Sequence, residues 1–279
     1  MRTLMPGLLF SSVFVVGAAL PAVAQYDDSD CAICHEETAA AFLKTGHAGA
    51  PGWDGKTDCQ SCHGPGDAHI EEGGDLEKII RPQTLSSRES SDTCLACHQR
   101  EEKHFSARHG IHRLGDVGCI SCHDPHSAAP AMLPVQGAEL CSECHQAVSA
   151  RFSMPRSHPM GAGGAGCASC HEPHASQGQH PTRTAPDDAC GSCHWEKTGP
   201  FLYAHDTLSV DGCLTCHEVH GSTNRHLLVQ ATQANLCYEC HAAGVTPGWH
   251  SAPRFLNEKC TACHAAIHGS NSSQFFLED

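Results

Sequence analysis

The stretch from residue 167 to residue 194 reads CASCHEPHASQGQHPTRTAPDDACGSCH and contains two copies of the pattern C-x-x-C-H. The same pattern recurs along the chain and uses all 20 cysteines, so it occurs ten times with no cysteine left over. We number these motifs 1 to 10 in chain order; they begin at Cys31, Cys59, Cys94, Cys119, Cys141, Cys167, Cys190, Cys213, Cys237 and Cys260. So regular a pattern is expected to decide the fold.

The spacing within each motif is typical of covalent haem c attachment, in which two thiols join the porphyrin and the adjacent histidine binds the iron. Disulfides and zinc sites also use cysteines, but neither requires a histidine after the second cysteine. We therefore expect ten covalently attached haem c groups. Each motif then also contributes its second cysteine, at Cys34, Cys62, Cys97, Cys122, Cys144, Cys170, Cys193, Cys216, Cys240 and Cys263, and a proximal iron ligand, at His35, His63, His98, His123, His145, His171, His194, His217, His241 and His264.

The composition is too poor in large apolar rings for an ordinary core. Aromatic residues make up only 5% of the chain, and each motif has about 25 residues of chain, fewer than the ~40 that usually fold without a cofactor or disulfide. The porphyrins are therefore expected to form the interior. The predicted fold is a multihaem cytochrome c, mostly irregular with short α-helices, in which an extended row of ten haems is built from five dihaem repeats.

Histidines outside the motifs recur in register. Each even-numbered motif has one histidine upstream and one shortly downstream, which gives ten candidates for the second axial ligand: His47, His69, His112, His126, His158, His174, His205, His220, His250 and His268. A lone histidine is more often a solvated surface residue, but ten in register favour bis-histidine ligation. Four histidines fall outside the register and are expected on the surface: His104, His109, His180 and His226. Of these, His109 lies close enough to His112 to be an alternative to it.

The segment after His171 sets a geometric limit. The second ligand must approach iron from the porphyrin face opposite the first, and His174 is tied to His171 through only Glu172 and Pro173. His174 should therefore reach a different haem. The same reasoning applies to the histidines that follow motifs 4 and 8 at this spacing.

The repeats are expected to open near residues 31, 94, 141, 190 and 237, with steps of 63, 47, 49 and 47 residues. Helix-forming residues and polar caps predict short helices over odd motifs, within 90–105, 137–152 and 186–205. Glycine, proline and aspartate around even motifs predict turns, and no strand is indicated. The longest interval between motifs, 66–92, is expected to be a loop, and GAGGAG at 161–166 a close approach to a haem.

The first residues are typical of a secretory signal, with Arg2, an apolar run and an A-x-A site before Gln25. We therefore expect residues 1–24 to be a signal peptide, residues 25–279 to be the decahaem domain and the protein to be periplasmic. The formal net charge of −14 argues against nucleic acid as a partner.

The chain resembles the periplasmic decahaem c-type cytochromes of the MtrA/DmsE type over nearly all of its length after the leader. The segments that carry the resemblance are CHGPGDAH, GDVGCISCHDPH, RSHP, CASCHEPH, CHWEKTGPFLYAH, CLTCHEVHGS and CHAAIHGS. The resemblance implies a haem wire held in an outer-membrane β-barrel porin. It would exchange electrons with a periplasmic or inner-membrane cytochrome on one side and an extracellular multihaem cytochrome on the other, in metal reduction or iron oxidation.

Three functions compete on the sequence. An electron conduit within a porin, associated with the outer membrane, agrees with the resemblance. A soluble periplasmic shuttle or electron store would have the same ligands. A multihaem reductase would need an iron with a vacant position, whereas the candidate ligands equal the motifs in number. We therefore expect electron transfer and no enzymatic activity.

Overall fold

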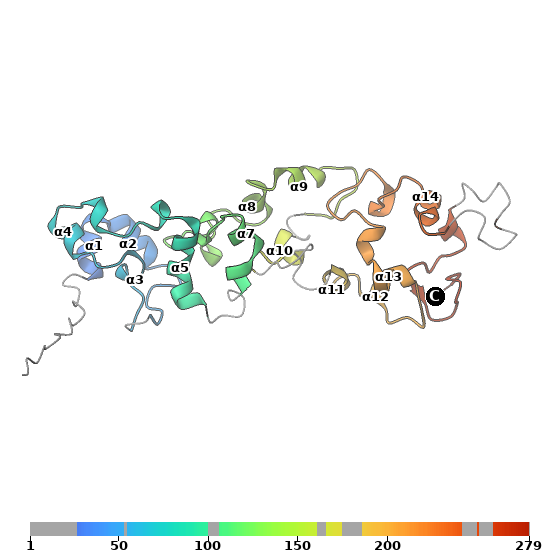
Figure 1. Cartoon of the computed structure of the whole chain (residues 1–279), viewed down its shortest axis with the longest axis horizontal. Helices are drawn as coiled ribbons and strands as arrows, with labels where there is room; N and C mark the ends of the chain where they lie inside the picture. Colours follow the sequence, from blue (N-terminus) through green and yellow to red (C-terminus); the bar gives the residue numbers. More distant parts are fainter. Residues whose placement is uncertain are drawn as a thin grey trace, which may run out of the picture.

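The computed structural model describes residues 27–52, 55–99, 106–160, 166–174, 186–241, 250 and 259–278. In these ranges the molecule is an elongated array of short helices and irregular segments (Figure 1). Position along its long axis broadly follows the sequence from the N-terminal helices to the C-terminal segments (Figure 1). The predicted fold of short helices and irregular chain is confirmed. The expected signal peptide and residues 161–165 of the glycine-rich segment lie outside the described ranges.

Each odd motif lies at least partly on a helix of its own. Two of these helices begin with a capping box, in which the N-cap side chain and the third residue exchange hydrogen bonds, at Asp27 with Asp30 and at Ser86 with Glu89. The helices that carry motifs 1, 3, 5, 7 and 9 are α1 (Asp28–Cys34), α5 (Ser87–His98), α8 (Ala138–Ser142), α11 (Pro186–Gly191) and α14 (Gln233–Tyr238). No helix in the described ranges is both long enough and apolar enough to cross a membrane.

Each even motif occupies a single helical turn. These turns are α3 (Gln60–His63), η4 (Cys119–Ser121), α10 (Cys167–Cys170), η6 (Cys213–Thr215) and η9 (Cys260–Ala262), where η marks a 3₁₀ turn. Glycine before motifs 4, 6 and 8, and glycine or proline soon after several motifs, keep these turns from extending into longer helices.

The remaining helices fill the intervals between motifs. They are α2 (Glu36–Phe42), α4 (Asp67–Glu71), η1 (Leu76–Lys78), η2 (Pro82–Thr84), η3 (Ser106–His109), α7 (Ile111–Leu114), η5 (Pro130–Met132), α9 (Gln146–Arg151), α12 (Trp195–Thr198), α13 (Asp206–Val210) and η7 (Arg225–Leu227). The interval 66–92, expected to be a loop, in fact contains α4, η1, η2 and the start of α5.

The expectation that no strand forms is wrong at one place. Strand β1 (Tyr203–Ala204) pairs antiparallel with β2 (Gly269–Ser270), with Tyr203 opposite Ser270 and Ala204 opposite Gly269. Each strand has only two residues, too few to give a recognisable sequence alternation. The pairing holds the segment after motif 7 against the segment after motif 10.

Side chains do not form a core of ordinary size. Among the described residues only two apolar side chains are buried, Leu95 at 3% exposure and Ala234 at 4%. Large apolar side chains beside the motifs are exposed: Ile33 within motif 1 is 78% exposed, and Trp195 directly after motif 7 is 73% exposed. This distribution is what a chain built around large apolar cofactors requires.

Odd and even motifs pack against each other in consecutive pairs. Helix α5 contacts η4, α11 contacts η6, and α14 contacts η9. In motifs 2 and 4 the backbone N–H of the first cysteine donates to the helix of the preceding odd motif: Cys59 to Asp28 Oδ1 on α1 at 2.9 Å and Cys119 to Ser91 Oγ on α5 at 3.2 Å. A side chain at Gly118 would put its Cβ 2.9 Å from the carbonyl oxygen of Ser87, so this approach requires glycine.

Candidate haem-binding sites

Each motif forms one turn that brings its three functional side chains together. In nine motifs the backbone N–H of the histidine donates to the carbonyl of the first cysteine at 2.8–3.0 Å, and motif 3 lies wholly within α5. Residues spaced by three and four on such a turn share one face. All twenty cysteines lie in the described ranges, and none of them forms a disulfide. Both thiols and the imidazole of a motif can therefore address the same haem.

Every motif histidine lies beside one histidine from outside the motifs. The ring centroids of the ten pairs are 6.0–6.4 Å apart: His35–His69, His63–His126, His98–His47, His123–His174, His145–His112, His171–His220, His194–His158, His217–His268, His241–His205 and His264–His250. Metal–imidazole bonds are about 2 Å long, so one iron between the rings, with the distance from each nitrogen to its ring centre added, accounts for this separation. The residues present therefore fit bis-histidine haem.

The pairing follows a rule along the chain. An even motif is paired with the histidine just downstream of the next even motif, as in His123 with His174. An odd motif after the first is paired with the histidine upstream of the preceding even motif, as in His145 with His112. In the first and last of these five units, motifs 1 and 10 are paired with a histidine from their own unit, at His69 and His250. Neighbouring units thus supply paired histidines to each other in both directions.

The four-residue segments that open with an even-motif histidine serve several sites at once. In His171-Glu172-Pro173-His174, the first histidine lies beside His220 and the last beside His123. The carbonyl of Pro173 accepts from Nδ1 of His112 at 3.1 Å, and His112 is paired with motif 5. The segment therefore touches the sites of motifs 4, 5 and 6.

The corresponding segment after motif 8 repeats this arrangement. His217 lies beside His268, and His220 lies beside His171. The carbonyl of Val219 is 2.9 Å from Nδ1 of His158, which is paired with motif 7. This repetition shows that the spacing has a geometric role and does not depend on the residues between the histidines.

Backbone carbonyl groups orient many of the paired imidazoles by accepting a hydrogen bond from Nδ1. Carbonyl oxygens lie 2.5–3.1 Å from Nδ1 of His63, His69, His112, His123, His158, His217 and His264. A hydrogen on Nδ1 leaves Nε2 free to bind a metal, so these contacts select the ligand tautomer. The carbonyls that face His123 and His217 belong to Ala131 and His226, both at φ above +50°.

Burial also favours the neutral imidazole. It lowers the pKa of His47, His126, His205, His220 and His268, and the positive charge of the partner motif histidine lowers the pKa of each further. A neutral imidazole is the form that binds a metal ion.

Cysteines of consecutive motifs meet along the molecule. The first cysteines of an odd motif and of the following even motif lie beside each other in the pairs Cys31–Cys59, Cys94–Cys119, Cys141–Cys167 and Cys237–Cys260. The second cysteine of an even motif lies near that of the next odd motif: burial first, and then the neighbouring thiolate, raises the pKa of Cys62 beside Cys97, of Cys122 beside Cys144, of Cys170 beside Cys193 and of Cys216 beside Cys240. These thiols stand in for the thioethers of the haem-loaded protein, so haems attached to them would follow one another in chain order.

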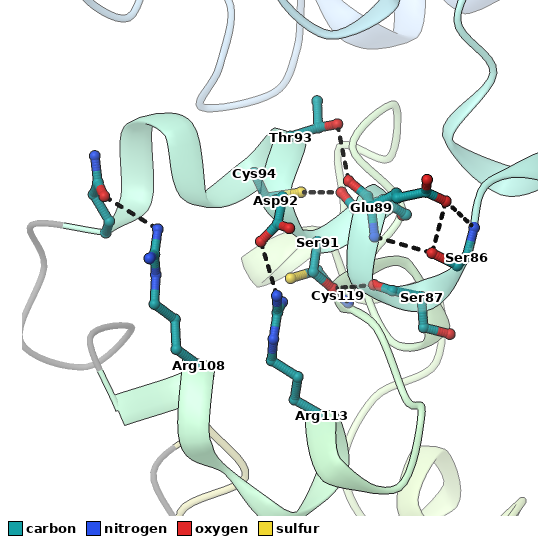
Figure 2. Close-up of polar contacts among 12 residues, drawn as sticks. Ser86, Ser87, Glu89, Ser91, Asp92, Thr93, Cys94, Arg108, Arg113 and Cys119 are labelled. Carbon is teal, nitrogen blue, oxygen red and sulfur yellow. Dashed lines mark hydrogen bonds and ion pairs between the residues drawn. The ribbon is translucent and has the colours of Figure 1, made fainter.

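A buried arginine lies between motifs 3 and 4. Figure 2 shows Arg113 on α7 reaching Asp92 on α5, with Nη2 2.8 Å from Oδ1. The side chain of Arg113 is only 14% exposed, and its Nη1 is buried without a hydrogen-bond partner. A carboxylate is the usual partner of a buried guanidinium, and each haem has two propionates, so this atom is a further point of fit.

Comparison with known proteins identifies the family of the motifs. The family model for a doubled CXXCH motif matches residues 109–150, 158–199 and 205–246. The multiheme cytochrome MtrA of Shewanella baltica is 30% identical in an alignment of 233 residues, and the match covers 76% of this chain and 68% of that protein.

This chain belongs to the MtrA-type multihaem cytochromes. As in other proteins with these motifs, its C-x-x-C-H sequences indicate covalently bound haem c, and its function is electron transfer. An undecaheme cytochrome from the S-layer of Carboxydothermus ferrireducens aligns at 16% identity with a TM-score of 0.19 and covers 80% of this chain. This chain spans about a third of that structure, a likeness too low to argue from.

The register of histidines along this MtrA-type chain predicts the ten that lie beside motif histidines, but it does not predict the atoms around them. His109 is exposed, whereas His112 lies beside a motif histidine, so the structure selects the second of these two candidates. His226 is also exposed, as expected, and His104 and His180 lie outside the described ranges. The acceptors at Nδ1 could not be found from spacing, because most are backbone atoms brought close by folding.

Proposed function

We propose that this protein is a decahaem electron conduit in which all ten motifs carry haem c and each iron has two histidine ligands. The observation that carries the proposal is the pairing of every motif histidine with a different histidine from outside the motifs. Two aromatic rings can lie at these distances by chance, but chance pairing would not select one partner from inside and one from outside the motifs ten times.

The bound haems would supply reversible one-electron exchange at iron. The chain's contribution is to fix both axial imidazoles and their tautomers, so no coordination position is left for a substrate. It also places the attachment cysteines of consecutive motifs next to each other along an elongated molecule. These features favour electron transfer from motif to motif over a multihaem reductase.

We further propose that the protein is exported by its N-terminal leader and associates with the outer membrane through a β-barrel porin. An extracellular multihaem cytochrome and a periplasmic or inner-membrane cytochrome would be its redox partners. The apolar leader and membership of the MtrA type support this placement, and the acidic composition disfavours nucleic acid. A free periplasmic shuttle is the alternative, and it requires no barrel partner.

Spectroscopy on the purified full-length protein tests the ligation. Ten haems per chain by mass and by haem absorbance, with only low-spin ferric signals in electron paramagnetic resonance (EPR), are expected. A high-spin signal equal to one haem would instead indicate a vacant iron and support the reductase.

Purification from native membranes in mild detergent tests the partner. A conduit should co-purify with a β-barrel protein and carry electrons across vesicles reconstituted with that complex. Recovery of the protein in the soluble periplasmic fraction alone would support the shuttle.

A further inference from the structure

We propose that Glu172 is a positioning residue that lowers the reduction potential of one haem, the one ligated by His123 and His174. This inference rests on the proposed function, since it requires iron between those two imidazoles. The carboxylate of Glu172 contacts the side of the His174 ring that faces away from the iron. Its Oε1 lies 3.1 Å from Nδ1 of His174 and 3.3 Å from the backbone nitrogen of the same residue.

The chemistry of this acceptor differs from that of the backbone acceptors. When Nε2 binds iron, Nδ1 of His174 carries hydrogen and donates it to Glu172. A carboxylate draws that hydrogen more strongly than a carbonyl does and gives the imidazole more anionic character, which makes it a more basic ligand. A more basic ligand stabilises ferric over ferrous iron, so the site accepts an electron at a lower potential.

The contact is sheltered and oriented from two sides. The side chains of Glu172 and His174 are 19% and 35% exposed, so water weakens their interaction less than it would on an open surface. Gly110 packs against the backbone of His174, where an added Cβ would lie 3.0 Å from the carbonyl oxygen. On the opposite ligand, Nδ1 of His123 is held by a carbonyl at 2.8 Å. The two ligands of this iron therefore have acceptors of different strength.

The chain offers a matched comparison at the same place in the segment after motif 4. Asp124 also follows a motif histidine and precedes a paired histidine by two residues. Its Oδ1 accepts from the backbone N–H of His126 at 2.9 Å, but lies 3.8 Å from Nδ1, too far for a hydrogen bond. Asp124 therefore supplies a similar charge without the contact to the ring.

The acidic residue at this position after motif 8 is paired with a basic side chain. Glu218, at the same place after motif 8, forms an ion pair with Arg151 at 2.6 Å. Its charge is thus compensated beside His220. Three acidic residues at one repeated position therefore give three different environments, and the acid–imidazole hydrogen bond is formed at Glu172.

The substitutions Glu172→Gln and Asp124→Asn test the proposal in the full haem-loaded protein. Glutamine can still accept a hydrogen bond but carries no charge. In Glu172→Gln we expect one low-spin EPR component, equivalent to one haem, to change its g values, and one step of a spectroelectrochemical titration to move to higher potential. In Asp124→Asn we expect neither change, beyond a small shift shared by neighbouring haems.

Equal effects of the two substitutions would overturn the proposal, because they would show that only charge matters. Conversion of the affected haem to high spin in Glu172→Gln would also overturn the proposal. It would show that Glu172 is needed only to keep His174 bound to iron and does not tune the reduction potential. If Glu172→Gln does not bind its haems, Glu172→Asp is the second variant. It keeps the charge, but its shorter side chain moves the carboxylate away from Nδ1 of His174, so the reduction potential should rise by a smaller amount. An unchanged spectrum would contradict the proposal. A wild-type protein without low-spin haem would instead contradict the proposed function.

Discussion

At the scale of single residues, a histidine near a motif need not serve that motif. His174 is three residues from His171 yet lies beside His123, which is 51 residues away in the chain. The short tether keeps His174 on the side of its own motif's haem, so it is available to the neighbour. The sterics visible in the sequence predict only that His174 serves another motif; the structure identifies that motif as motif 4.

His174→Ala should therefore change the haem of motif 4 and leave that of motif 6 intact. Removal of the imidazole leaves one iron with a single protein ligand, so one haem should become high-spin and able to bind carbon monoxide. EPR and carbon monoxide difference spectra measure this. His109→Ala is the control, since His109 is exposed and should leave all haems low-spin.

The affected haem can be assigned by combining substitutions. His123→Ala alone should also perturb one haem, and the double variant with His174→Ala should perturb the same single haem. Two separate high-spin haems in the double variant would contradict the pairing.

At the scale of elements, tight turns place the paired histidines. His220 is followed by Gly221 at φ +157°, and a Cβ there would lie 1.9 Å from the carbonyl oxygen of Arg151. The next residue, Ser222, is 7% exposed, exchanges backbone hydrogen bonds with Arg156 and donates from Oγ to the carbonyl of Leu228 at 2.9 Å. The sequence His-Gly-Ser recurs at the C-terminal end of the chain, where a Cβ at Gly269 would lie 2.2 Å from the ring of Phe201. In both places the glycine lets two segments meet behind a ligand.

Gly221→Ala should destabilise the protein by about 1–3 kcal/mol, the usual cost of forcing atoms into a packed site. Because the displaced segment carries His220, we also expect the haem of motif 6 to lose its second ligand in part of the population. Thermal unfolding and the high-spin EPR signal measure the two effects. Gly66→Ala is the matched control, since no atom lies within 4 Å of the added Cβ; an equal loss of stability there would contradict the explanation.

At the scale of the whole molecule, the exchange of ligands makes the units interdependent. Each inner unit completes a site in the unit before it and in the unit after it, so none has all its ligands by itself. The strand pair β1–β2 adds a direct link between the segments after motifs 7 and 10. We expect unfolding to be cooperative over several units, beyond what stacked independent repeats would show.

His268→Ala tests this interdependence over a distance. His268 lies four residues after His264 of motif 10 but beside His217 of motif 8. The variant should therefore gain one high-spin haem at motif 8 and keep the haem of motif 10 low-spin, and the tenth site should be lost only with His250→Ala. Loss of the low-spin EPR signal of the motif 10 haem in His268→Ala would contradict this expectation, because it would show that the last unit supplies its own ligands.

The elongated shape should persist in solution. A compact domain of about 255 residues has a radius of gyration of ~18 Å, whereas a chain that extends along its haems should have a clearly larger one. X-ray scattering of the haem-loaded monomer measures this, and a value near that of the compact domain would contradict the shape.

Three features that define the chemistry of the protein can be read from the order and type of its residues: ten C-x-x-C-H motifs, the histidines in register with them, and an interior that side chains cannot fill. These follow from covalent spacing and composition, which need no knowledge of the fold. The folded chain was needed to show which histidine faces which motif, that 66–92 is partly helical, that β1 and β2 pair, and that Glu172 lies beside Nδ1 of His174. Those features depend on contacts between residues far apart in the chain, and local spacing and composition do not reveal such contacts.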